Sequence, residues 1–239
     1  MPDKGTASLH WDYRDGRVAA VAAAVVYSLW VLEMVLPGGE TVRAAPGEPV
    51  SAFEAFWESA HRMASILVMV AAGLGLSLGA RETRRWLLVS WWAMFAFGAL
   101  SLATSLIPGR CTVSTDVACT VEALVEGAGG PATLQAVLAV AAMAAALLSV
   151  VALAVNRWRR GDRMWVPVAV LAGFQAVTAV GVLVVSWVFV SSGTGQPGTA
   201  MGTAERAHLV ALALWLLAAG LLRGPWLRTP RARRAAAPR

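Results

Sequence analysis

The charged residues that flank the apolar runs of this chain are its strongest candidates for chemistry. Glu33 closes the first apolar run, and Glu205 and Arg206 open the last. A carboxylate in or near hydrocarbon is costly, so it marks a candidate functional site with a partner to be found. We predict that Glu33 pairs with Arg206 across the mouth of a helix bundle. A structural ion pair between the first and last helices is the simpler interpretation, and ligand binding is the alternative.

A second group, Glu58, His61 and Arg62, precedes the next apolar run at helical spacing. Together with neighbouring aromatic residues, it predicts a short amphipathic helix that lies in the outer interface of the membrane. Glu58-x-x-His61 has the spacing of a half-site in di-iron bundles, which need a second such motif and further carboxylates on facing helices. A zinc site would have to recruit His208 and distant carboxylates. We therefore predict no metal site and no cofactor.

The two cysteines of the chain, Cys111 and Cys119, are separated by seven residues. This spacing predicts a local disulfide on an oxidising outer side of the membrane. A disulfide that closes such a small loop stabilises the folded state by about 2–3 kcal/mol, so it would restrain the loop but would not determine the fold. Redox catalysis is the alternative interpretation, but it usually uses a C-x-x-C spacing and a partner thiol pair, which the sequence lacks.

The composition indicates which elements must position these residues. Of 239 residues, 58% are apolar and 14% are charged, and the mean hydropathy is +0.63. A soluble domain has roughly 45–50% apolar and about 25% charged residues, so both a soluble globule and a disordered chain are excluded. The net charge of +6 comes from arginines in short clusters between apolar runs. No basic stripe is present, so we predict no nucleic-acid partner.

Six apolar runs approach the length of about 20 residues that a helix needs to cross a bilayer. They are too long and continuous for the strands of a barrel. The sequence therefore predicts an all-α bundle of six transmembrane helices, of which the first is retained as a span. The predicted spans are Val18 to Leu36, Met63 to Ala80, Trp86 to Ile107, Thr133 to Val155, Met164 to Val190 and Ala207 to Leu222.

Lysine and arginine residues are concentrated in every second one of the segments that flank or join these runs. Sixteen lie in residues 1–17, 81–85 and 157–163 and in the tail from Arg223, against four in the remaining connections. Positively charged segments stay inside the cell, so we predict a plasma-membrane protein with both termini in the cytoplasm. We therefore predict that the chain divides into a cytoplasmic segment at 1–17, one transmembrane domain at 18–223 and a disordered basic tail at 224–239.

Four short motifs resemble the DUF998 family of bacterial six-span membrane proteins, especially its actinobacterial members. They are Tyr27-Ser28-Leu29-Trp30-Val31-Leu32-Glu33, Pro108-Gly109-Arg110-Cys111, Asp116-Val117-Ala118-Cys119 and Glu205-Arg206. The resemblance covers about residues 18 to 223 and implies a six-span membrane protein without an assigned activity. Similar proteins tend to carry a histidine at the start of the fourth span, where this chain has Gly130-Pro131-Ala132-Thr133-Leu134-Gln135. No histidine-dependent activity is therefore carried over.

Three function classes follow from these residues. We favour a non-enzymatic protein of the cell envelope whose outer mouth binds a lipid, a small molecule or a membrane-protein partner. A small-solute transporter that uses the Glu33 and Arg206 mouth is the second class, although no internal repeat supports it. A lipid hydrolase that uses Glu58, His61, Asp116 or Glu122 as acid or base is the third.

Overall fold

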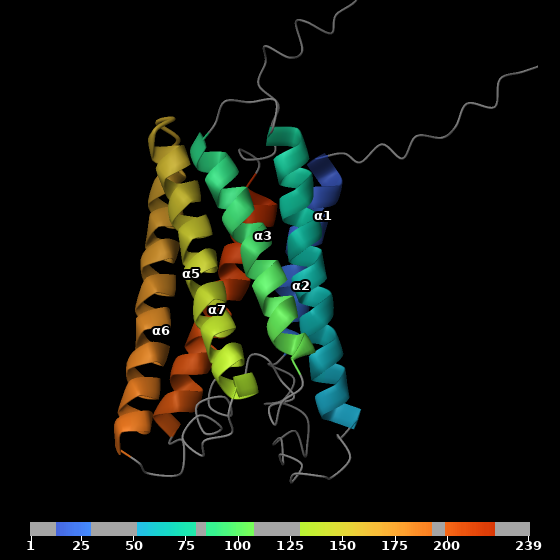
Figure 1. Ribbon diagram of the computed structural model, residues 1–239. Coiled ribbons are helices and arrows are strands. Elements are labelled where there is room, and N and C mark those ends of the chain that lie inside the picture. The colour runs from blue at the N-terminus through green and yellow to red at the C-terminus, as the bar shows by residue number, and fades with distance from the viewer. Residues whose placement is uncertain (1–12, 30–51, 80–84, 108–129, 193–198, 223–239) are drawn as a thin grey trace, which may run out of the picture.

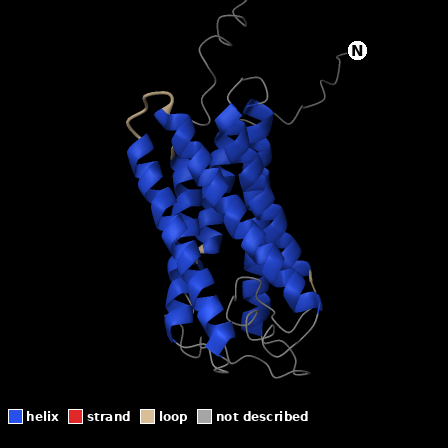
Figure 2. Ribbon diagram, turned by 60° about the vertical axis from the view of Figure 1, so that its left-hand side comes forward, coloured by secondary structure: helices blue, strands red, loops and turns tan. Residues whose placement is uncertain are grey.

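A computed structural model of the chain describes residues 13–29, 52–79, 85–107, 130–192 and 199–222 (Figure 1). Within these ranges all regular secondary structure is helical, and no strand occurs (Figure 2). This confirms the all-α class. The helices are α1 (Tyr13–Tyr27), α2 (Ala52–Gly79), α3 (Arg85–Leu106), α5 (Gly130–Trp158), α6 (Trp165–Ser192) and α7 (Thr199–Leu221).

The helices run up and down in alternation and form a closed ring. Each helix contacts the next one along the chain, and α7 returns to contact α1. The start of α1 and the end of α7 therefore lie at one end of the bundle, together with the ends of α2 and α5 (Figure 1). We call this the arginine-rich end, because it carries seven of the nine described arginines. They are Arg14, Arg17, Arg85, Arg157, Arg159, Arg160 and Arg163, against Arg62 and Arg206 at the opposite end.

Five of these helices are long and apolar enough to cross a membrane. The spanning stretches are Ala55–Ser77, Arg85–Leu106, Gly130–Trp158, Trp165–Ser191 and Thr203–Leu221. The chain is thus built as a multi-pass membrane protein. The first predicted span is described only as far as Leu29, because its last seven residues, 30–36, lie outside the described part of the chain.

Apolar side chains on the outside of the bundle agree with lipid surroundings. On α6, Val170, Val177 and Trp187 are each more than 60% exposed. In water such a surface would be unfavourable, but in hydrocarbon it costs nothing, so a helix that is apolar all round suits a membrane.

Small residues let the helices approach closely. A Cβ on Gly75 would lie 2.5 Å from the ring of Trp91, and one on Gly98 would lie 2.8 Å from the Ser65 carbonyl oxygen. Ala71 is fully buried one turn before Gly75. Membrane helices associate through such small-residue contacts, because lipid removes the hydrophobic drive between them.

Polar contacts also join neighbouring helices inside the bundle. The Ser90 hydroxyl donates to the Ser149 carbonyl at 2.9 Å, and the Ser149 hydroxyl donates to the Ser90 carbonyl at 2.8 Å. This reciprocal pair fixes α3 against α5 where both are buried.

The segment that carries Glu58, His61 and Arg62 differs from its prediction. It is part of α2, which runs without interruption from Ala52 to Gly79, so these residues do not form a helix separate from the span. Arg62 Nη2 donates to Glu58 Oε1 and to the Ser105 carbonyl, both at 2.8 Å, whereas Glu58 Oε2 and Arg62 Nε have no partner. The two bonds offset part of the cost of charged groups in this helix.

Candidate functional site

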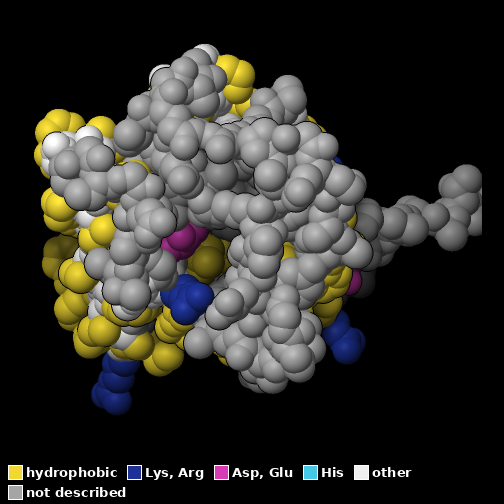
Figure 3. Space-filling view, turned by 90° about the horizontal axis from the view of Figure 1, so that it is seen from below, with side chains coloured by type: hydrophobic (Ala, Val, Ile, Leu, Met, Phe, Trp, Pro, Cys, Tyr) yellow, Lys and Arg dark blue, Asp and Glu magenta, His cyan; other side chains and the backbone are white. Residues whose placement is uncertain are grey.

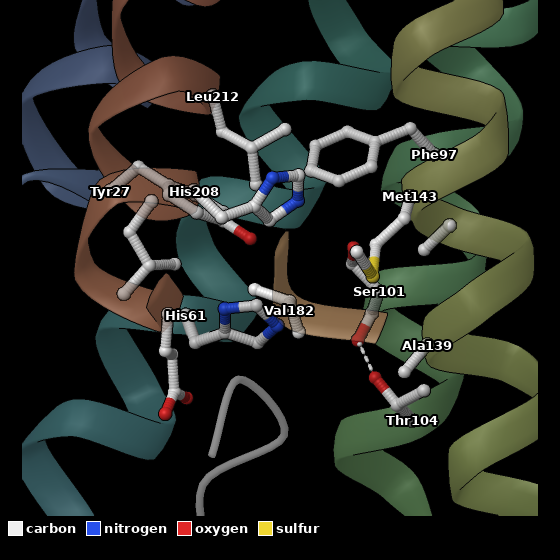
Figure 4. Close-up of a pocket in the computed structure, with 13 residues that line it drawn as sticks. Tyr27, His61, Phe97, Ser101, Thr104, Ala139, Met143, Val182, His208 and Leu212 are labelled. Carbon is white, nitrogen blue, oxygen red and sulfur yellow. Dashed lines mark hydrogen bonds between the residues drawn. The ribbon is translucent and has the colours of Figure 1, made fainter. Parts of the chain in front are cut away.

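A small cavity lies inside the ring, in the half of the bundle opposite the arginine-rich end. Its volume is about 50 Å³. Side chains from α1, α2, α3, α5, α6 and α7 line it, and the polar ones are Tyr27, His61, Ser101, Thr104, Glu205 and His208 (Figure 4). A few water molecules or one small polar group fit such a space. We call it the two-histidine cavity.

His208 projects into the cavity from α7, and one of its ring nitrogens has a side-chain partner. Thr178 Oγ1 lies 3.3 Å from His208 Nδ1 and 3.1 Å from the Gln175 carbonyl oxygen. A hydroxyl both donates and accepts, so the direction of the bond to His208 depends on the tautomer of the imidazole. The other ring nitrogen, Nε2, is buried and has no hydrogen-bond partner.

His61 reaches the same cavity from α2, where Tyr27 and Ser101 also line it. The rings of Tyr27 and His61 lie 5.6 Å apart at 56°. The Nε2 atom of His61 is buried and has no hydrogen-bond partner.

The two Nε2 atoms are the unusual feature of the cavity. Both histidines are less than 10% exposed, and neither Nε2 atom has a hydrogen-bond partner in the structure. Buried polar groups are normally paired, so an unpaired acceptor calls for an explanation such as a bound ligand or water. Two unpaired ring nitrogens on residues that line one small cavity suit a small group that forms hydrogen bonds with imidazole.

The predicted charged residues are distributed differently around this cavity. Glu205 lines it, whereas Arg206 is exposed at the adjacent position of α7. Glu58 and Arg62 pair with each other on α2 and do not line it. Seen from this end, acidic and basic side chains lie among mainly hydrophobic ones (Figure 3). Further predicted residues lie outside the described part of the chain: Glu33, Asp116, Glu122, Cys111 and Cys119.

The structure draws attention to a motif that our prediction overlooked. Glu205-Arg206-Ala207-His208 on α7 repeats the Glu-x-x-His pattern of Glu58-Ser59-Ala60-His61 on α2. Both histidines face the two-histidine cavity, but Glu58 turns to Arg62 instead. Within the described ranges no three His, Cys, Asp or Glu residues group closely enough to hold a metal ion. The repeat therefore brings two imidazoles to one cavity.

Gln175 extends the polar interior from the cavity towards the middle of α6. Its side chain is fully buried, and neither amide atom has a hydrogen-bond partner. Only its backbone carbonyl is engaged, by Thr178. Our prediction examined the spans for charges and passed over this neutral side chain, although an amide in the centre of a span is itself a signal.

The hydroxyl groups around the cavity are engaged within their own helices. Thr104 Oγ1 donates to the Ser101 carbonyl at 2.7 Å, and Thr178 Oγ1 donates to Gln175.

Comparisons with known proteins found no similar protein. No protein-family model, no curated protein and no solved structure matches it. The resemblance to the DUF998 family therefore stays a prediction.

Proposed function

We propose that this chain is a non-enzymatic, six-span protein of the cell envelope that binds a small polar group in the two-histidine cavity. The observation that carries the proposal is the pair of buried Nε2 atoms, on His61 and His208, that have no partner. The ligand group carries N–H or O–H donors, as a primary ammonium or a hydroxyl does. It belongs to a small molecule or to the head of a lipid, because the cavity itself is small.

The wider architecture in this proposal follows the distribution of charge. The arginine-rich end lies in the cytoplasm with both termini, and the cavity opens towards the outside of the plasma membrane. A disulfide between Cys111 and Cys119 holds Asp116 near the outer mouth, where Glu33 pairs with Arg206. Membership of the DUF998 family belongs to the same proposal. Its support is the alternating ring of helices and the seven-to-two division of described arginines.

Thermal unfolding of the purified chain in phosphatidylcholine nanodiscs tests the binding site. We expect methylammonium chloride to raise the unfolding temperature, whereas tetramethylammonium chloride, which has no N–H donor, should have no effect. His208→Phe and His61→Phe should each abolish the difference between the two salts. Arg163→Gln serves as the matched control, because this exposed residue lies at the arginine-rich end and does not line the cavity. Equal stabilisation by both cations, or a response that survives both histidine variants, would contradict the proposal.

A separate experiment tests the orientation. A single cysteine placed in the tail after residue 223, in a chain with Cys111 and Cys119 replaced by serine, should resist a membrane-impermeant maleimide in intact cells. It should react fully after the membrane is opened. Labelling of the tail in intact cells would reverse the proposed orientation.

Transport of a small solute is the second candidate, and Gln175 is the observation that favours it. Thr178 lies 3.3 Å from His208, and Gln175, three residues before Thr178 on α6, has a fully buried side chain whose amide atoms have no partner. Polar residues within spans often mark a path for a solute or proton. Flux into liposomes that is lost in Gln175→Leu and reduced in Glu33→Gln would support transport, and flux unchanged by both would remove it.

A further inference from the structure

A groove between α1 and α7 lies at the arginine-rich end of the bundle, away from the two-histidine cavity. Its volume is about 420 Å³, within the range of about 300–1,000 Å³ that is common for ligand sites. Arg14 and Arg17 line its polar end, and apolar residues of both helices line the rest: Val18, Val21, Ala22, Gly220 and Leu221.

Arg17 is held in place by the end of the neighbouring helix. Its Nε donates to the Gly220 carbonyl at 2.8 Å, and its Nη2 donates to the Leu221 carbonyl at 3.1 Å. A guanidinium has five N–H donors, so three remain for another acceptor. Because the group is already anchored, it loses little further freedom when it binds an anion.

Arg14 adds a second positive charge one turn earlier on the same helix. It is exposed, and it lines the groove together with Arg17. Guanidinium groups recognise phosphate oxygens with paired hydrogen bonds. Two arginines at the polar end of one groove therefore make a phosphate-binding position at the depth where α1 begins.

The apolar part of the groove continues from this position along α1. Val18 is 60% exposed and Leu221 is 56% exposed, so both borders of the groove present hydrocarbon to the surroundings. Gly220 brings the two helices together, since a Cβ there would lie 2.7 Å from Val21 Cγ2. A chain of methylene groups fits against this surface in a bilayer.

We infer that the groove between α1 and α7 binds a phospholipid with an anionic head group, with the phosphate at Arg14 and Arg17 and one acyl chain along Val18, Val21 and Ala22. Charge complementarity identifies the occupant, because basic pockets between spans bind anionic head groups. The inference requires only that the chain lies in a membrane, and it is independent of the ligand of the two-histidine cavity.

Native mass spectrometry of the full chain tests this site. The purified protein is exchanged against mixed vesicles of phosphatidylglycerol and phosphatidylcholine with identical acyl chains. The wild type should retain phosphatidylglycerol preferentially, and Arg14→Gln should reduce the preference about fivefold, the effect of one basic residue near a charged membrane surface. Arg17→Gln should reduce it at least as much, although this variant also removes the bonds to α7.

Matched variants separate the groove from general charge at this end. Arg163→Gln removes an exposed arginine from the turn between α5 and α6, outside the groove, and should leave the preference unchanged. Ala22→Phe obstructs the apolar part without touching either arginine and should lower retention of both lipids. Equal retention of the two lipids by the wild type, or a loss in Arg163→Gln equal to that in Arg14→Gln, would overturn the inference.

Two further outcomes identify other occupants. Displacement of phosphatidylglycerol by millimolar inorganic phosphate would show that a free anion suffices, and would overturn the lipid assignment. Dimers that form without phosphatidylglycerol and disappear in Ala22→Phe would show that a second copy of the chain fills the groove.

Discussion

The two ends of the bundle use their polar residues in different ways. At the arginine-rich end, Arg17 donates to the last carbonyls of α7, and Arg157 pairs with Asp162 in the turn between α5 and α6, although Arg157 Nε and Nη2 have no partner. In the two-histidine cavity, the Nε2 atoms of both histidines have no partner, and His208 Nδ1 lies 3.3 Å from Thr178 Oγ1. The first arrangement secures helix ends. The second leaves two ring nitrogens unpaired beside one cavity, at a cost in stability.

The largest expected effect concerns the buried ion pair between Arg157 and Asp162 at the arginine-rich end. Asp162→Asn removes the charge that faces Arg157, whose side chain is only 4% exposed, but keeps an oxygen that can accept from the Met164 N–H. A buried cation without its carboxylate is strongly destabilising, so the free energy of unfolding should fall by about 3 kcal/mol. Circular dichroism during titration with sodium dodecyl sulfate measures it.

Arg163→Gln in the same turn is the control for Asp162→Asn. It removes an exposed charge, so it should change the free energy of unfolding by less than about 0.5 kcal/mol. Equal losses in the two variants would show that the turn responds to any change of charge, and the buried pair would lose its special role.

The next effect concerns the contact between the first and last helices. Gly220→Ala places a Cβ 2.7 Å from Val21 Cγ2 and 3.0 Å from the Arg17 carbonyl oxygen, so α1 and α7 must separate slightly. Overpacking of this kind costs about 2 kcal/mol. Gly173→Ala meets no atom within 4 Å and should be neutral or stabilising by up to about 1 kcal/mol. The same detergent titration compares them, and equal effects would contradict a tight α1–α7 contact.

Near the two-histidine cavity, we expect one substitution to raise the free energy of unfolding instead of lowering it. Gln175→Leu removes a buried amide that has no partner, so the free energy of unfolding should rise by about 1–2 kcal/mol. Gln135→Leu is the matched control, because its amide donates to the carbonyls of Thr104 and Ile107 at 3.5 and 3.4 Å. That variant should lose stability. A loss in Gln175→Leu as well would show that the amide has a stabilising role in the empty protein.

The smallest effect is expected for the ion pair on α2. Glu58→Gln weakens a pair with Arg62 whose side chains are 14% and 43% exposed. Pairs this accessible contribute about 0.5 kcal/mol, and salt screens them. Chemical denaturation at low and high ionic strength should therefore show a small loss that shrinks with salt. A loss as large as that of Asp162→Asn would remove the contrast between the two ends.

The positions of most helices could be predicted because hydrocarbon imposes a simple rule on composition. The predicted spans at 86–107, 133–155 and 164–190 coincide closely with α3, α5 and α6, which contain few charges. The helix starts of α2 and α7 could not be predicted in this way. Both helices begin well before the predicted spans, at Ala52 and Thr199, because charged side chains within them find partners or line the cavity.

The same reasoning explains why the candidate site was predicted only in part. Searching for charge-free runs separated Glu58, His61 and Glu205 from the helices that carry them, so the repeated Glu-x-x-His pattern was not connected to one cavity. His208 was considered only as a ligand of a zinc site that we did not predict, and Gln175 entered no predicted site, because a single neutral polar residue in an apolar run is usually structural. Only the ring of helices shows that His208 and His61 line one cavity.

The closure of the ring by α7 has a consequence for biosynthesis. Helices enter the membrane in the order of translation, and α1 can contact α2 long before its other neighbour exists. Until Gly220 arrives beside Val21, the Arg17 guanidinium lacks the two carbonyls that it binds in the finished protein. The ring is therefore closed only after α7 has been made, and a ribosome that stops before α7 leaves α1 with one side exposed to lipid.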